Sequence, residues 1–77
     1  MTLSNLVPGE TATVTSYNPT VKALRKQLLA MGLTPGTQVT VVRVAPLGDP
    51  MELKLRGFSL TLRKDHADAV NIELNSN

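Results

Sequence analysis

The 77-residue sequence contains no cysteine and no tryptophan, and it has one histidine, one tyrosine and one phenylalanine. Without cysteine the chain cannot form a disulfide framework, a zinc ribbon or a thiol nucleophile, and this composition fits a reducing compartment. No run of about 18 apolar residues is present, so no transmembrane helix is predicted. The opening MTLSNLVPGE lacks the basic and apolar regions of a secretory signal. The absence of a Gly-x-x-x-x-Gly-Lys motif excludes a P-loop nucleotide hydrolase.

The charge is only mildly basic. Eight Lys and Arg against six Asp and Glu give a net charge of +2 and a pI near 9.4, far from the dense basic blocks of nucleic-acid arms. A nucleic-acid-binding barrel is an alternative function, but it requires aromatic platforms for base stacking. Only Tyr17 and Phe58 are available, and Phe58 is predicted to face inward. We expect one domain over residues 1–77 with a single small core and a frayed polar tail at 75–77.

The strongest local pattern is MELKLRGFSLTLR, residues 51–63, in which apolar and polar residues alternate on both sides of Arg56-Gly57. Such alternation is typical of strands with one solvated face. Gly57 supplies the positive φ that a tight hairpin turn requires. Folding the segment about a two-residue loop predicts five cross-strand pairs: Leu55–Phe58, Lys54–Ser59, Leu53–Leu60, Glu52–Thr61 and Met51–Leu62. A shift by one residue would move the apolar set to the wrong face.

Three more segments have strand character: residues 11–16, with Ala12 and Val14 inward, 37–44 and 70–74. The third is VNIEL, with Val70, Ile72 and Leu74 on one side. The alternation breaks at Val41-Val42, which predicts either a bulge or partial cover on both faces. Five short strands and one helix indicate a mainly β fold, a small closed SH3-like or OB-like barrel with the helix between the first two strands.

One helix is predicted from about Thr20 to Met31, after the break at Asn18-Pro19 and with Thr20 or Asn18 as its cap. Its core stripe is Val21, Leu24, Leu28 and Met31. Gly32 follows as the left-handed stop, and a shorter turn is expected over residues 64–69.

Prolines and glycines mark the turns. Leu6-Val7-Pro8-Gly9 and Leu33-Thr34-Pro35-Gly36 each predict a type II turn, with glycine at the position of positive φ. In APLGDP, residues 45–50, Pro46 and Pro50 end the pairing on each side, and Gly48-Asp49 forms a turn. A phosphate cradle is disfavoured, because two N–H groups are missing and Asp49 repels anions. Leu47 at the tip is a candidate docking residue.

The helix carries a second candidate surface. Lys22, Arg25 and Lys26 lie beside its core stripe, and Leu29 falls among them. Leu29 either packs on the shoulder of the barrel or anchors a partner whose acidic surface the basic groups attract.

His66 has Asp65 and Asp68 as its nearest carboxylates in the sequence, and residues one and two apart do not share a helix face. We therefore expect an exposed or capping histidine and only a weak metal candidate, because tight transition-metal sites need three or four donors. A direct Fe(II) chaperone centred on His66 with Asp65, Asp68 or Glu52 is a third hypothesis.

The segment RKQLLAMGLTPG, residues 25–36, followed by VTVVRVAPLGDPMELKLRGFSLTLRK, resembles the FeoA family of small proteins of bacterial ferrous iron uptake. The resemblance implies an SH3-like barrel without enzymatic activity or cofactor. It also implies a cytoplasmic adaptor, recruited to the inner face of the inner membrane, that binds the ferrous iron permease FeoB, whose cytoplasmic part carries a GTP-binding domain. FeoA-like domains also occur on iron-dependent repressors, and homo-oligomerisation stays open.

Two sets of residues follow from these patterns. The predicted partner-binding residues are Lys22, Arg25, Lys26, Leu29, Leu47, Gly48 and Asp49. The residues assigned to structural turns are Gly32, Pro35, Gly36, Pro46, Pro50 and Gly57.

Overall fold

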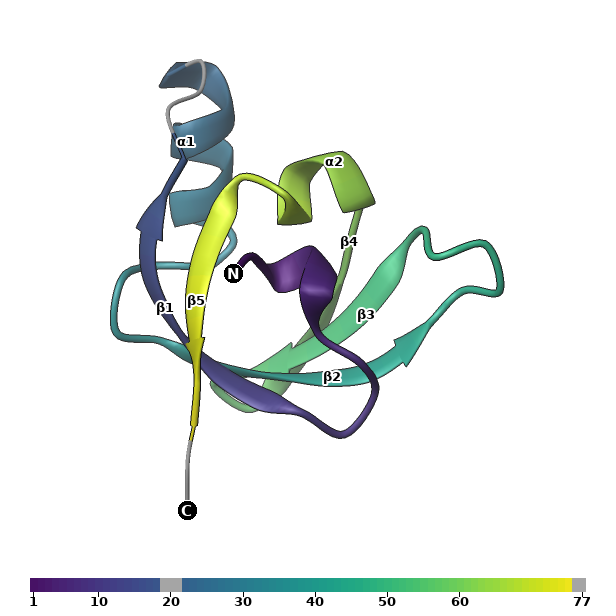
Figure 1. Ribbon diagram of the computed structural model, residues 1–77. Helices are drawn as coiled ribbons and strands as arrows, with labels where there is room; N and C mark the ends of the chain where they lie inside the picture. The colour runs from purple at the N-terminus through teal and green to yellow at the C-terminus, as the bar shows by residue number, and fades with distance from the viewer. Residues whose placement is uncertain (19–21, 76–77) are drawn as a thin grey trace.

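The protein is described by a computed structural model over residues 1–18 and 22–75 (Figure 1). Its elements in chain order are η1 (Leu3–Asn5), β1 (Thr11–Tyr17), α1 (Lys22–Ala30), β2 (Gln38–Val44), β3 (Met51–Leu55), β4 (Phe58–Leu62), α2 (Lys64–Ala67) and β5 (Val70–Leu74). The strands form one antiparallel sheet in the order β4-β3-β2-β1-β5. The predicted mainly β fold, with a helix between its first two strands, is confirmed.

The helix ends as its sequence indicates. The Met31 N–H still donates to the Gln27 carbonyl at 3.0 Å, and Gly32 then adopts a φ of 92°. This left-handed conformation favours glycine and stops the helix. Leu28 is fully buried, and Leu24 and Met31 pack partly buried against the core. The proposed cap Thr20, the preceding Pro19 and the stripe residue Val21 lie outside the described residues.

The β3–β4 hairpin has the predicted register, with all five cross-strand pairs as expected. Arg56 and Gly57 both have positive φ, 50° and 84°, as a type I′ turn requires. One expectation was wrong: Phe58 is 47% exposed rather than inward. Phe58 begins an edge strand at the end of the hairpin, where β3 covers only one side of it.

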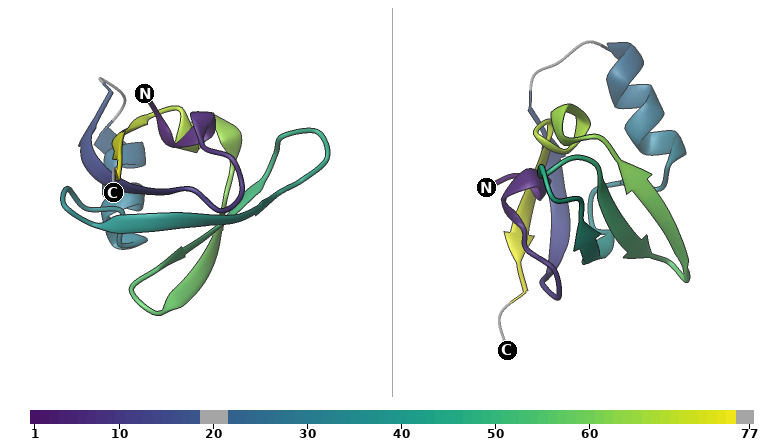
Figure 2. Two further views of the ribbon diagram at one scale, coloured as in Figure 1. Left: turned by 60° about the horizontal axis from the view of Figure 1, so that its bottom comes forward. Right: turned by 90° about the vertical axis from the view of Figure 1, so that its right-hand side faces the viewer.

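The irregularity predicted in β2 is a bulge. The β2–β3 register shifts between Val41 and Arg43, so that Val41 is 1% exposed while Val42 is 42% exposed. A second shift, between Val14 and Ser16 in the β1–β5 ladder, has no counterpart in the sequence pattern. Bulges increase local twist and bend a strand, and these two accompany the strong curvature of the sheet in Figure 2.

From the sequence we expected strand pairing to close the sheet into a barrel, and the structure differs on this point. In the described chain no ladder joins β4 to β5, and α2 connects these two edges instead. The unpredicted η1 contacts both α2 and β5, and its Leu3 is fully buried. The opening between the edges is therefore covered by short helices, because η1 and α2 each bring an apolar side chain to the core.

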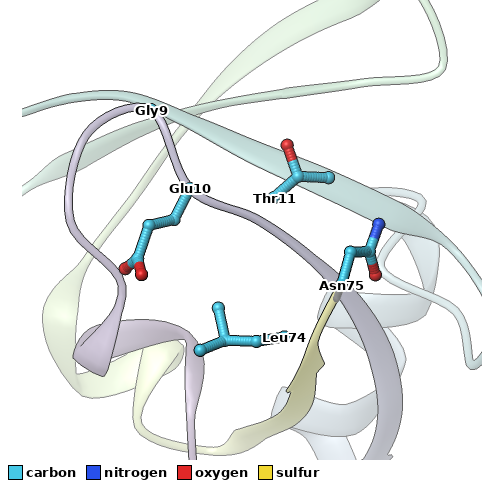
Figure 3. Close-up of a pocket in the computed structure, with 5 residues that line it drawn as sticks. All are labelled: Gly9, Glu10, Thr11, Leu74 and Asn75. Carbon is cyan, nitrogen blue, oxygen red and sulfur yellow. The ribbon is translucent and has the colours of Figure 1, made fainter. Parts of the chain in front are cut away.

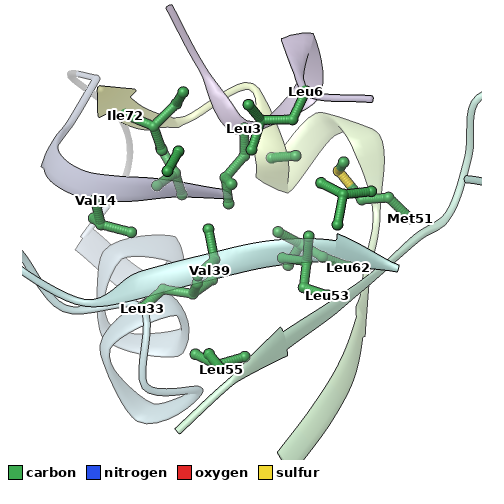
Figure 4. Close-up of a cluster of buried hydrophobic side chains, with 14 of the residues drawn as sticks. Leu3, Leu6, Val14, Leu33, Val39, Met51, Leu53, Leu55, Leu62 and Ile72 are labelled. Carbon is green, nitrogen blue, oxygen red and sulfur yellow. The ribbon is translucent and has the colours of Figure 1, made fainter. Parts of the chain in front are cut away.

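The core lies inside the curved sheet (Figure 4). Its largest fully buried side chains are Leu3, Val14, Leu28, Leu33, Val39, Val41, Leu53, Leu62 and Val70. Burial of each such side chain contributes about 1.5–3 kcal/mol. Leu74, which the alternation placed inward, is 40% exposed at the end of β5.

The two predicted type II turns are present. The Glu10 N–H donates to the Val7 carbonyl at 3.1 Å, and the Thr37 N–H donates to the Thr34 carbonyl at 3.0 Å. Gly9 and Gly36 hold the positive φ positions. None of the helices within residues 1–18 and 22–75 combines the length and the apolar character needed to cross a bilayer.

Candidate functional site

The predicted basic residues and leucine of α1, which we call the helix surface (Lys22, Arg25, Lys26 and Leu29), are all exposed. Leu29 is 41% exposed, so it does not belong to the buried core. The helix presents its buried side chain, Leu28, to the barrel and turns this stripe outward. The arrangement places an apolar side chain within a group of three cations, which is the composition expected for attracting an acidic surface.

Arg25 is held in place by β1. Its guanidinium carbon lies 5.7 Å from the centroid of the Tyr17 ring, within the range of a cation–π contact. The Tyr17 hydroxyl donates to the Leu33 carbonyl. Burial raises the pKa of the Tyr17 phenol above its ordinary value, and the charge of Arg25 partly offsets that rise. Tyr17 thus connects the helix surface to the segment that follows the helix.

Phe58 enlarges the apolar part of this region, which the sequence reasoning missed. A Cβ built on Gly32 would lie 3.7 Å from the Phe58 Cζ and 3.6 Å from the Leu55 Cδ1, so the Phe58 ring lies beside the end of α1. The Gly32 N–H in turn donates to the Leu29 carbonyl at 3.1 Å. The position of Phe58 at the hairpin tip, next to Gly57, was the available signal for its exposure.

The second predicted surface is the loop surface (Leu47, Gly48 and Asp49) between β2 and β3. The Gly48 N–H donates to the Ala45 carbonyl at 2.7 Å, which closes a turn with Pro46 at its second position. The loop is therefore a short, hydrogen-bonded connection, but its turn is centred on Pro46-Leu47 and not on the Gly48-Asp49 pair expected from the sequence. Leu47 at its tip is 94% exposed, so a preorganised turn presents a leucine to solvent.

Asp49 has an intramolecular role that the sequence did not indicate. Its Oδ1 accepts the backbone N–H of Lys64 at 2.8 Å, which satisfies one of the unpaired N–H groups at the start of α2. The carboxylate therefore joins the loop to the element that bridges the two sheet edges. Of the three residues in the loop surface, Leu47 is the one whose side chain points fully into solvent.

The structure does not bring the two surfaces together. In Figure 1 and in the left view of Figure 2, α1 and the β2–β3 loop lie at opposite ends of the molecule, whose principal extents are 30 × 29 × 23 Å. A partner that contacts both would have to span the domain. The helix surface and the loop surface are therefore separate candidate sites.

His66 is partly buried and lacks a set of metal donors around it. Among residues 1–18 and 22–75 no group of three or more His, Cys, Asp or Glu side chains is placed to hold a metal ion. The three carboxylates considered as co-ligands have other partners: Asp65 lies 3.4 Å from Arg63, Asp68 accepts from Ser4, and Glu52 lies 2.9 Å from Arg43. The donor set of a tight transition-metal site is not assembled there.

An open hollow of about 480 Å³ lies between β1 and the end of β5 (Figure 3). It is lined by Gly9, Glu10, Thr11, Leu74 and Asn75. The Glu10 carboxylate accepts the Val7 N–H at 2.8 Å, so it serves the preceding turn. Glu10 is the one titratable side chain in this lining, and general acid–base catalysis of the paired-carboxylate kind requires a second.

These features define a small SH3-like barrel domain whose distinctive side chains are on its outer surface. The sequence profile of the FeoA domain matches residues 1–74, and the chain belongs to the FeoA family. This family is associated with ferrous iron transport. The resemblance noted in the sequence is thereby confirmed.

A relative from Porphyromonas gingivalis is named as a fusion of Fe(2+) transport protein A with the Fe(2+) transporter FeoB. It is 34% identical over 74 residues, which cover 96% of this chain and 9% of the fusion protein. The chain therefore spans less than a tenth of the length of this curated relative.

Two solved structures confirm the fold. The NMR structure of an FeoA-like protein from Clostridium acetobutylicum has a TM-score of 0.90 at 31% identity, covering 100% of this chain and 88% of that one. The crystal structure of Stenotrophomonas maltophilia FeoA in complex with zinc has a TM-score of 0.82 at 28% identity, covering 95% and 89%. The latter is described as a prokaryotic SH3-domain protein.

Proposed function

We propose that this chain is a non-catalytic adaptor of bacterial ferrous iron uptake. It binds the cytoplasmic part of a FeoB-type permease, at the inner face of the membrane, and modulates Fe(II) transport. The observation that carries the proposal is the Porphyromonas gingivalis protein, in which a region similar to this chain is joined to a FeoB transporter. Covalent linkage gives two modules a high effective concentration, so weak docking between them becomes sufficient.

The helix surface is the proposed docking site. Leu29 on α1 is exposed, as is Phe58, whose ring lies near Gly32 at the end of the helix. Lys22 and Lys26 add positive charge on the same helix. An apolar centre with a polar rim is the usual anatomy of a protein interface. The cations favour approach to an acidic surface and increase the association rate at low salt. Leu47 is a second docking site at the other end of the domain.

The direct test is an NMR titration of the isotope-labelled chain with the cytoplasmic domain of its permease, with and without GTP. The proposal expects shift changes at Leu29 and its helical neighbours, at Phe58, and separately at Leu47. The comparison with and without GTP reports whether the nucleotide controls docking. Shift changes confined to other faces, or none at saturating permease domain, would contradict the proposal.

Matched variants make the test specific. Leu29→Asp places a negative charge within the helix surface and should weaken permease binding by about tenfold or more. Val42→Asp is the control, because Val42 is 42% exposed but lies on β2 and belongs to neither surface. Leu47→Asp tests the loop surface alone. Equal binding by the Leu29→Asp and Val42→Asp variants would remove the helix surface from the proposal.

A further inference from the structure

The β4 strand has one edge without a hydrogen-bonding neighbour, because it is the terminal strand in the order β4-β3-β2-β1-β5. In a two-residue hairpin the residues flanking the loop, Leu55 and Phe58, form a hydrogen-bonded pair. Hydrogen-bonded and non-hydrogen-bonded pairs then alternate along the ladder. The backbone groups of Phe58, Leu60 and Leu62 therefore bond to β3, and those of Ser59 and Thr61 point away from it.

These outward groups are accessible. Ser59 and Thr61 are both exposed, and no residue of the described ranges 1–18 and 22–75 forms a hydrogen bond with their backbone N–H or C=O groups. In the right view of Figure 2, β4 lies along one margin of the sheet. The strand thus presents a row of unpaired donors and acceptors of the kind that pairs with another extended chain.

The opposite edge of the sheet is protected. On β5 the Ile72 N–H donates to the Met1 carbonyl at 3.0 Å, and Asn71 pairs with Thr2. The N-terminal residues therefore occupy part of that edge. On β4 the sequence FSLTL contains no charge and no proline, and its register with β3 has no shift. The devices by which proteins usually protect an edge strand, which are charged residues, proline and bulges, are absent from the β4 strand itself.

We propose that the β4 edge binds an extended segment of a partner protein by strand addition, and that this segment carries alternating apolar residues with acidic residues at both ends. Main-chain hydrogen bonds to Ser59 and Thr61 would supply affinity, as in other complexes formed by strand addition. The half-exposed Phe58 ring and the partly exposed Leu60 supply the apolar contacts.

Charge at the ends of β4 defines the partner. Arg56 precedes the strand, and Arg63 and Lys64 follow it, all three exposed. Arg63 lies 3.4 Å from Asp65, so that pair is close to neutral and Lys64 adds a positive charge. A second copy of the chain fits less well, because antiparallel pairing centred on Leu60 would place Arg56 of one copy opposite Lys64 of the other. Like charges opposed across a ladder are unfavourable.

The β4 edge shares Phe58 with the docking site proposed for the permease, but its hydrogen-bonding groups are those of Ser59 and Thr61, which belong to neither the helix surface nor the loop surface. The proposal therefore stands whether or not the permease binds. The probe is the capped peptide Asp-Glu-Val-Thr-Val-Thr-Val-Glu-Asp, titrated into the isotope-labelled chain while amide hydrogen exchange is recorded by NMR. At saturating peptide the Ser59 and Thr61 amides should exchange about tenfold or more slowly. Unchanged exchange at both amides would overturn the proposal.

Two modified peptides keep the side chains and charges of the probe. One is N-methylated on the valines and the other on the threonines. Only one of these sets directs its N–H groups toward β4, because N–H groups alternate along a strand. One modified peptide should therefore fail to slow hydrogen exchange at the Ser59 and Thr61 amides, and the other should still slow it. Equal binding by both modified peptides would show that the peptide binds through its charges and side chains without strand pairing, and would overturn the proposal.

A protein variant supplies an independent test. Thr61→Pro deletes an outward N–H, at the kind of edge position where proline is accepted, and Thr61→Val is the matched control. The proline variant should bind the probe peptide about tenfold more weakly, and the valine variant should bind it as the unmodified chain does. If the proline variant does not fold, the methylated peptides with the unmodified chain decide the question. Concentration-dependent dimerisation that protects the same amides without peptide would favour self-pairing and overturn the proposed partner.

Discussion

The Asp49 carboxylate and the Lys64 backbone N–H form a 2.8 Å hydrogen bond that joins the β2–β3 loop to the first residue of α2. The bond lies at the open end of the β3–β4 hairpin, opposite its turn, since Asp49 precedes β3 and Lys64 follows β4. It holds in place the short helix that connects β4 to β5. The loop that seemed from its sequence to be a docking element therefore also stabilises the barrel.

Substitution of Asp49 by alanine should reduce the free energy of unfolding by about 1 kcal/mol, because the first turn of α2 loses a capping acceptor. Urea unfolding measures the effect. Leu47→Ala on the same loop is the control and should change stability by less than about 0.5 kcal/mol, since Leu47 is almost fully exposed. Equal stabilities for the two variants would show that the capping bond contributes nothing.

Substitution of two neighbouring leucines on α1 should change the stability of the chain by very different amounts. Leu28→Ala should destabilise the chain by about 2–5 kcal/mol, because it leaves a cavity at a fully buried position. Leu29→Asp should leave stability within about 1 kcal/mol, since its side chain is 41% exposed. Thermal unfolding followed by circular dichroism compares them. Strong unfolding of the Leu29→Asp variant would place Leu29 in the core.

The β3–β4 turn should not tolerate a β-branched residue at Gly57. Gly57 has a φ of 84°, where a residue with a Cβ is strained by about 1–2 kcal/mol. Gly57→Val should lower the urea midpoint accordingly, although a Cβ there meets no atom within 4 Å. Ser59→Val, two residues later in β4 and with ordinary φ, is the comparison. An unaffected midpoint in the Gly57→Val variant would indicate that the turn relaxes to another type.

The pH dependence of stability at alkaline pH should report Tyr17. Burial raises the pKa of its phenol in the folded chain, so the unfolded chain loses this proton first. Tyr17 therefore contributes stability that is complete below about pH 10, the ordinary pKa, and is lost as pH rises through the folded-state pKa. Because Tyr17 is the one tyrosine, phenolate absorbance follows it directly.

Comparison with Tyr17→Phe isolates this effect. The variant loses the hydrogen bond to the Leu33 carbonyl, which should cost about 1 kcal/mol near neutral pH. The stability difference between the two proteins should then shrink as pH rises above about 10. A difference that stays constant through that range would mean that the folded and unfolded phenols have the same pKa.

Local chemistry made the hairpin predictable. Arg56-Gly57 separates two alternating segments, so turn type and side-chain period together allow one register, and that register is observed. The end of α1 at Gly32 and the turns ending in Gly9 and Gly36 follow for the same reason, since only glycine adopts positive φ at no steric cost. The bulge was visible at Val41-Val42, where the alternation of apolar residues fails.

The exposure of Phe58 could not be read from alternation. A period of two assigns Phe58 to the same face as Leu60 and Leu62, but whether that face is covered depends on which elements lie over it. β4 is the last strand of the sheet, and the Phe58 ring lies near Gly32, just after the end of α1. The partner-binding assignments stay predictions, because side-chain exposure permits docking and does not identify the partner.

What the chain encodes locally is its set of turns, strand faces and helix stop, each governed by residues adjacent in sequence. Tertiary structure alone decided that the barrel is closed by η1 and α2 rather than by a β4–β5 ladder, and that the helix and loop surfaces lie at opposite ends. It also decided that Asp49 caps α2 and that β4 keeps an unpaired edge. These features depend on contacts between residues distant in sequence, and no periodicity of side chains along the chain specifies them.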